Sequence, residues 1–307
     1  MVVRSRPSLF VILFTLQGSI LPRVAPKILG ISAFALAVVA VERAWPGPFP
    51  VGPGVAPFTL IGLALSIFLS FRNGACYDRW WEARRAWGTL ILETRGLARI
   101  LPAVLGPEQE PLRRRSLRRV CAFAHALHAH LRGAGHKAEA EAARPWLPDS
   151  EADQALPPSP ADAALTGLGQ DLGNAFRAGT ISDVVFGMLE QKIAALAQVQ
   201  VICERILGTP LPFAYTLLLY RTAWLYCLLL PFGLAGTLGW ATPVATALVA
   251  YTFFGLDALG DELEEPFGTE PNDLPLDAML RQVEAIVRDA LGEAPPPPLH
   301  PEKSVLR

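Results

Sequence analysis

The sequence predicts an all-α membrane protein with four transmembrane helices per subunit and a large cytosolic helical domain. Of its 307 residues 51% are hydrophobic and only 18% are charged, whereas about a quarter of the residues in an ordinary soluble domain are charged. Two stretches, residues 44–71 and 222–256, contain no charged residue. A further apolar run lies nearer the N-terminus, and a segment rich in Arg and Trp follows residue 71, as at a membrane interface.

Residues 1–27 form a predicted interfacial or cytosolic segment. Arg4 and Arg6 precede the mostly apolar residues 9–16, a pattern that superficially fits a secretion signal. However, Arg23 and Lys27 follow, and there is no small-x-small cleavage site. We therefore expect a helix that lies on the cytoplasmic leaflet rather than a cleaved signal.

Residues 28–72 are predicted to hold the first two transmembrane helices. The apolar run at residues 28–41 is shorter than the roughly 20 residues that a span needs, so the first helix is expected to extend over residues 25–45. A loop rich in Pro and Gly begins at residue 46 and leads to a second span over residues 55–71.

A cytosolic helical domain is predicted for residues 73–208. Residues 70–88, SFRNGACYDRWWEARRAWG, place arginines and tryptophans directly after the second span. We interpret them as interface anchors and packing residues, and the periodicity predicts that the helix continues into the cytosol. Residues 133–160, rich in Ala, Glu and Pro, are expected to form an exposed insertion or a loose helix.

Residues 209–256 are predicted to hold two further spans, separated by a turn that contains Pro231, Gly233, Gly236 and Gly239. Residues 257–307 form a cytosolic C-terminal segment with an acidic turn, a helix and a Pro-rich tail. Because Lys and Arg concentrate near the N-terminus and in the predicted helical domain, the positive-inside rule places that domain and both termini in the cytoplasm.

The composition excludes several functional classes. A net charge of −1 gives no basis for binding nucleic acid, and four cysteines without a CxxC pair argue against a disulfide framework or a zinc site. His125, His128 and His130 are expected to have no acidic partner near them, so we interpret them as surface histidines rather than metal ligands. With no nucleophile–base set and no phosphate-binding loop, we predict neither an enzyme nor a bound cofactor.

The chain resembles the bacterial bestrophin homologues in three segments that lie in the family's order. They are residues 70–88, residues 205–222 (RILGTPLPFAYTLLLYRT) and residues 255–277 (GLDALGDELEEPFGTEPNDLPLD). The resemblance implies a homopentamer around one central pore, which passively conducts monovalent ions across the lipid bilayer of the bacterial inner membrane. Eukaryotic members conduct anions such as chloride and some prokaryotic relatives favour cations, so the sign of the permeant ion stays open.

The second span carries the candidate pore neck. Leu63, Ile67 and Phe71 lie at i, i+4 and i+8 and therefore share one helix face. They match the positions at which the family has a narrow apolar neck, and large apolar side chains there would gate the pore by excluding water. The alternative is that this is simply one apolar face of a membrane helix.

The family also has a constriction at the cytosolic exit of the pore. Our candidate is Leu211, between two prolines, with Thr209 as its nearest competitor. Prolines remove backbone donors and fix φ, so the same residues equally fit a kink where a helix enters the membrane.

The acidic stretch after the last predicted span is a candidate calcium site. Eukaryotic bestrophins hold calcium in an acidic turn at this point, and Glu265, Glu270 and Asp273 would supply the carboxylates here. Because Glu265 stands where an amide is usual, and because non-acidic residues interrupt the acidic stretch, a solvated acidic surface is the preferred interpretation.

The alternative to a channel is a non-conducting membrane scaffold or signalling protein whose cytosolic helices bind a partner.

Overall fold

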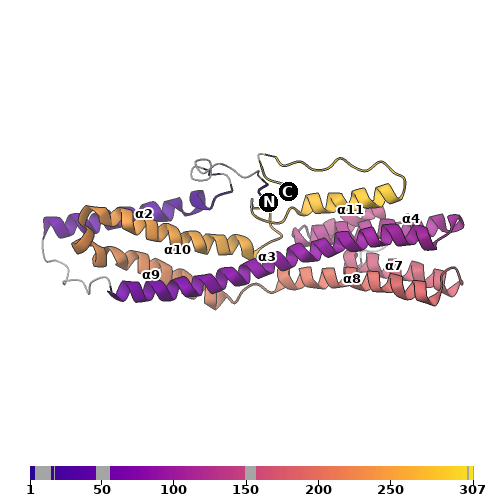
Figure 1. Cartoon of the computed structure of the whole chain (residues 1–307), viewed down its shortest axis with the longest axis horizontal. Helices are drawn as coiled ribbons and strands as arrows, with labels where there is room; N and C mark the ends of the chain where they lie inside the picture. Colours follow the sequence, from indigo (N-terminus) through magenta and orange to yellow (C-terminus); the bar gives the residue numbers. More distant parts are fainter. Residues whose placement is uncertain (4–14, 17, 46–55, 149–156, 303, 307) are drawn as a thin grey trace. The chain divides into compact units, whose positions relative to one another are not determined.

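The computed structural model describes residues 1–3, 15–16, 18–45, 56–148, 157–302 and 304–306. Regular structure within these residues is helical, apart from isolated bridges that Val305 makes with Val2 and Glu302, which confirms the all-α prediction. The helix predicted at residues 9–16 lies almost wholly outside the described residues, and so does the loop that begins at residue 46. The chain divides into two compact units (Figure 1): residues 1–3, 81–209 and 267–307 form one, and residues 4–80 and 210–266 form the other.

The second of these units, here called the apolar unit, contains the long apolar helices. Its helices are α2 (Leu21–Ala44), the first half of α3 (Ala56–Val104), α9 (Phe213–Leu238), the short η3 (Gly239–Ala241) and α10 (Thr242–Glu264). Helix α10 packs against α2 and α9, and α2 also packs against α9. Among the described residues, three helical stretches are long and apolar enough to cross a membrane: Leu21–Ala44, Ala56–Val104 and Phe213–Glu264. The prediction that the third stretch crosses twice is not tested by length and composition.

Two element boundaries differ from the prediction. Helix α2 begins at Leu21, so Arg23 and Lys27 lie inside it; the proline at its first turn is compatible with a helix start. Pro231 lies inside α9, and the break between α9 and α10 falls at Gly239, whose φ is +50°. The predicted turn was therefore too broad, because the other small residues there serve helix packing: a Cβ on Gly233 would lie 2.4 Å from the ring of Phe58.

The other unit, here called the polar unit, is built around a central helix. Its helices are the second half of α3, η1 (Pro107–Gln109), α4 (Glu110–Leu131), α5 (His136–Ala143), η2 (Arg144–Trp146), α7 (Pro160–Arg177), α8 (Asp183–Gly208) and α11 (Leu276–Ala290). Helix α4 packs against α5, α7, α8 and α11. The predicted continuation of the second apolar helix past Phe71 is confirmed, since α3 runs unbroken to Val104.

The described residues 133–148 and 157–160 differ from an exposed insertion. They contain α5 and η2, and Trp146 is only 7% exposed. The ring of Trp146 stacks on His125 of α4, with ring centroids 5.5 Å apart, and the guanidinium of Arg288 from α11 lies over it. Trp146 therefore helps to hold α5 and η2 against α4.

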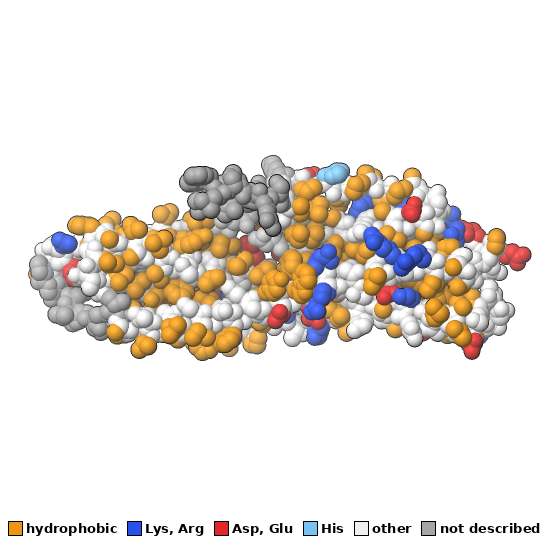
Figure 2. All heavy atoms as spheres, viewed as in Figure 1, with side chains coloured by type: hydrophobic (Ala, Val, Ile, Leu, Met, Phe, Trp, Pro, Cys, Tyr) orange, Lys and Arg blue, Asp and Glu red, His pale blue; other side chains and the backbone are white. Residues whose placement is uncertain are grey.

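The surfaces of the two units differ in chemistry. Hydrophobic side chains run along the visible face of α2, α9 and α10, whereas most of the visible Lys and Arg side chains belong to the polar unit (Figure 2). Apolar surface of this extent marks a membrane or protein contact.

Candidate functional site

The first half of α3 has two sharply different faces. One face is buried and consists of Gly62, Leu65, Leu69, Arg72 and Cys76, at the alternating spacing of three and four that defines a helix stripe. The other face carries the three candidate neck residues. Leu63, Ile67 and Phe71 are 59%, 46% and 67% exposed. The structure thus places three large apolar side chains in one row that the other described residues leave largely exposed.

The buried face of α3 is fixed by close packing within the apolar unit. Leu65 and Leu69 belong to a core cluster with residues of α2, α9 and α10, among them Phe254. Gly62 lies directly against Tyr226, because a Cβ added at Gly62 would be 2.8 Å from the tyrosine hydroxyl oxygen. The rotation of α3 about its axis is therefore set by contacts on the side opposite to the candidate neck.

A buried arginine cluster, which the sequence analysis did not predict, lies beside Phe71. The Arg72 guanidinium donates to three carboxylates on α10: Nη1 to Asp257 at 2.8 Å, and Nη2 to Asp261 at 2.6 Å and to Glu264 at 3.5 Å. Arg23 of α2 also reaches Asp261, at 3.3 Å. The interpretation as an interface anchor is wrong for Arg72, whose exposure is only 1%.

The spacing of these carboxylates was the signal that could have revealed the cluster. Asp257, Asp261 and Glu264 lie at i, i+4 and i+7 and so share one face at the end of an otherwise apolar helix. Three carboxylates on one buried face need a cation, because a buried unpaired charge is strongly unfavourable. The sequence analysis treated them only as part of an acidic stretch.

The two aperture candidates lie at the break between α8 and α9. Thr209 is the residue that ends α8, and its N–H donates to the Arg205 carbonyl oxygen at 3.0 Å. The backbone N–H of Leu211 donates to Oε1 of Glu264 at 3.0 Å, and the Leu211 residue is half-buried. These positions do not test whether either residue narrows a pore.

The calcium candidates lie in the turn after α10. Glu265 follows the last residue of that helix and is exposed, whereas Asp273 is buried. The Asp273 carboxylate accepts a hydrogen bond from the backbone N–H of Glu270 at 2.7 Å, so one of its oxygens closes the turn. Among the described residues no group of three or more His, Cys, Asp or Glu side chains could hold a metal ion.

The histidines of α4 have acidic partners, contrary to the prediction. His125 lies 2.8 Å from Glu284 and His128 lies 2.6 Å from Asp277, both on α11, while His130 lies 3.0 Å from Glu139 on α5. The hydrogen bond from His128 lowers the pKa of Asp277 from its ordinary value, and the nearby Arg132 guanidinium lowers it further. These pairs join helices, and the two α11 partners are far from the histidines in sequence.

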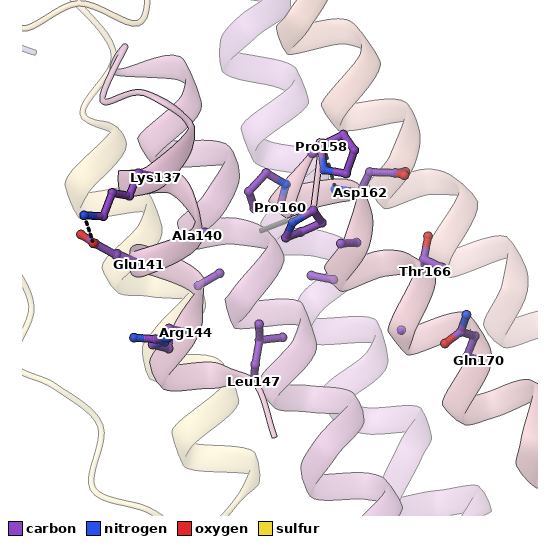
Figure 3. A pocket seen from close by; sticks show the side chains of 16 residues that line it. Lys137, Ala140, Glu141, Arg144, Leu147, Pro158, Pro160, Asp162, Thr166 and Gln170 are labelled. Atoms are coloured by element: carbon purple, nitrogen blue, oxygen red, sulfur yellow. Dashed lines mark hydrogen bonds and ion pairs between the residues drawn. The ribbon is translucent and has the colours of Figure 1, made fainter. Parts of the chain in front are cut away.

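The polar unit also contains a cavity of about 750 Å³ between α5 and α7 (Figure 3). Its walls combine alanines and prolines with side chains of both charge signs, including Asp162, and Lys137 lies 3.9 Å from Glu141 on its rim. The lining contains no nucleophile–base pair, and its charges are too mixed to select one kind of ligand.

Known proteins share similarity with this chain along most of its length. Residues 1–289 match the family described as Bacterial/Fungal Bestrophin protein. The voltage-dependent anion channel-forming protein mll4386 of Mesorhizobium japonicum is 47% identical over 307 residues, which cover 99% of this chain and 96% of the relative. The voltage-dependent anion channel-forming protein YneE of Escherichia coli K12 is 38% identical over 285 residues, with 92% of each chain covered.

A solved structure from the same family is similar to this chain in fold as well as in sequence. The crystal structure of a bacterial bestrophin homologue from Klebsiella pneumoniae has a TM-score of 0.83 and 37% sequence identity, and the match covers 89% of this chain and 100% of that chain. Together with the three apolar stretches, these matches identify the chain as a membrane protein of the bacterial and fungal bestrophin family.

Proposed function

We propose that the protein is a passive channel for monovalent ions in the bacterial inner membrane, with anions as the conducted species. The observation that carries the proposal is the uncovered row of Leu63, Ile67 and Phe71, opposite a face of α3 that is fully packed. Family membership and the names of the relatives, which are called anion channel-forming proteins, support conduction rather than catalysis.

In the proposed assembly, α3 from each of five copies contributes its uncovered row to a central pore. Each of the three positions would then form an apolar ring. An ion entering such a neck loses hydration without gaining polar contacts, so a small change in ring diameter switches the neck between dry and wet. The neck carries no charge, and selectivity would come from weaker fields such as aromatic ring edges and helix dipoles.

The proposed topology has four spans, with α9 and α10 crossing separately, and with both termini in the cytoplasm. The cytosolic exit would be narrowed by Leu211 or Thr209. Glu265 and Glu270 of the acidic turn are proposed to be a solvated surface rather than calcium ligands. The buried Asp273 uses one carboxylate oxygen to close the turn.

The test is a reversal-potential measurement in a KCl gradient, with purified protein in planar bilayers. A reversal potential near the chloride equilibrium value supports an anion channel. A value near that of potassium would contradict anion selectivity while supporting a channel. Protein of pentameric mass that never passes current would refute conduction and favour the membrane scaffold.

A matched pair of leucines tests the neck itself. Leu63 on α3 and Leu225 on α9 are exposed to nearly the same extent, 59% and 58%. Leu63→Ala should raise single-channel conductance, as should Ile67→Ala or Phe71→Ala, because each shortens a ring side chain. Leu225→Ala should leave conductance unchanged. Equal effects at Leu63 and Leu225, or no effect at any of the three α3 positions, would remove the neck assignment.

A further inference from the structure

We propose that Arg72 is the positioning residue of the neck: the carboxylates of α10 hold its guanidinium, and this clamp fixes the rotation of α3 so that Phe71 faces away from the helix bundle. That the exposed face of α3 forms a neck is part of the proposed function, and the present proposal rests on it for that point. The clamp itself is a matter of packing within one compact unit and can be tested without ion conduction.

The first argument is the position of Arg72 in the chain. It directly follows Phe71, so the two side chains project from α3 about 100° apart. Phe71 is 67% exposed whereas the Arg72 side chain is completely buried. Any rotation of α3 that moved Phe71 would also have to move the guanidinium out of its contacts with Asp257, Asp261 and Glu264.

The second argument is that α10 is shaped to receive this guanidinium. A Cβ added at Gly260 would lie 3.2 Å from Nη1 and 3.4 Å from Cζ of Arg72, and 2.6 Å from the side-chain oxygen of Asn73. Asn73 in turn donates to the Leu256 carbonyl oxygen at 3.1 Å. The absence of a side chain at Gly260 therefore lets two consecutive residues of α3 lie against the backbone of α10.

The third argument is that the clamp extends beyond α3 and α10. Glu264 accepts from Arg72 with Oε2 and from the backbone N–H of Leu211 with Oε1. One carboxylate thus joins the end of the neck row to the chain that enters α9. Arg79, two turns further along α3, also donates to the Glu264 carbonyl oxygen, at 3.3 Å.

The burial of Arg72 argues against a direct role in attracting ions. Three carboxylates of α10 face the guanidinium groups of Arg72 and Arg23. The Arg72 cation is surrounded by carboxylates and has no exposed atom on the neck face. Its effect on conduction must therefore pass through the orientation of α3.

Thiol labelling of the purified full chain tests the clamp without a current. The four native cysteines are buried, so the parent protein should show little labelling and serves as the background. Leu69→Cys, on the buried face, should react with a maleimide only slowly until the protein is unfolded. Adding Gly260→Ala or Asp261→Asn should raise the Leu69→Cys rate at least tenfold.

The control is Gly74→Ala, since Gly74 also lies on α3 but has no atom near its Cβ position among the described residues. It should leave the Leu69→Cys labelling rate unchanged. Arg72→Met should act like Gly260→Ala, and Arg72→Lys should restore part of the protection at position 69. Asp261→Asn is the mildest of these changes, because its side chain is 38% exposed, and it keeps the test valid if Arg72→Met does not fold.

Single-channel conductance connects the clamp to the neck. Gly260→Ala should change the conductance at least twofold in the parent but produce no further change when Phe71→Ala has already removed the most cytosolic ring. Unchanged labelling at position 69 in both Gly260→Ala and Asp261→Asn would overturn the clamp, whether or not the protein conducts. Increased labelling in a protein that never conducts would support the clamp and contradict the proposed channel.

Discussion

Replacing Gly167 of α7 by alanine tests how the polar unit is held together. Gly167 faces the guanidinium of Arg119 on α4: an added Cβ would lie 2.1 Å from Nη1 and 2.6 Å from Cζ. Arg119 is only 4% exposed and donates to Asp171 at 2.8 Å. The new methyl group would have to push the guanidinium away from a carboxylate that stands one turn along the same helix.

The expected change in the free energy of unfolding combines a loss at the ion pair and a gain from the helix preference of alanine. Removing one partner of a buried ion pair costs about 3–5 kcal/mol. Here both partners remain, and Arg115 still lies 3.5 Å from Asp171, so about half of that cost, roughly 2 kcal/mol, is the appropriate figure. Alanine gains about 0.5–1 kcal/mol over glycine within a helix. The net loss of about 1–1.5 kcal/mol corresponds to a fall in Tm of about 2–6 °C.

Gly169→Ala is the matched control, because Gly169 lies on the same helix with no described atom within 4 Å of its Cβ position. It should gain only the stability that alanine has over glycine within a helix, and its Tm should rise by about 1–4 °C. The assay is thermal unfolding of the two purified variants and the parent in one detergent, followed by circular dichroism. If Gly167→Ala is as stable as Gly169→Ala, the packing of Arg119 over this glycine does not contribute as argued.

Two further predictions concern titration and thiol chemistry in the polar unit. Because the pKa of Asp277 is lowered by the His128 hydrogen bond, its contribution to stability is present above the ordinary Asp value and is lost as pH falls through the folded value. Asp277→Asn should therefore be less stable than the parent at pH 7, and the difference should shrink as pH falls below the ordinary Asp value; a constant difference would contradict the pairing. Burial raises the pKa of the Cys203 thiol to about 12, so the native protein should not react there with a disulfide reagent at pH 8 until it is unfolded, and prompt reaction would show that the thiol is accessible.

The sequence was sufficient where the physical cause is local. Runs without charge predicted the apolar helices because a membrane span depends on the composition of one segment. The helical period after Phe71 likewise predicted that α3 continues, since consecutive turns of one helix carry the signal. Even the row of Leu63, Ile67 and Phe71 follows from spacing alone, and the structure places all three side chains on an uncovered face.

The sequence was insufficient where a residue's environment depends on distant segments. The acidic partner of His128 is Asp277, which follows 149 positions later, so no local sequence pattern revealed the pair. Arg72 looked like an interface anchor for the same reason, as its closest carboxylates are 185 and 189 positions away. The start of α2 at Leu21 was missed because charged residues in its first turns concealed a helix that the proline at its start permits.

The two glycine contacts described above have a common form within this protein. In both units an arginine from one helix lies over a glycine of another, and an acidic residue follows that glycine by four positions: Gly167 with Asp171, and Gly260 with Glu264. In α7 that acid supplies the close counter-charge, whereas in α10 Asp257 and Asp261 bind the arginine more closely than Glu264 does. A side chain added at either glycine would therefore disturb an ion pair between two helices as well as their packing.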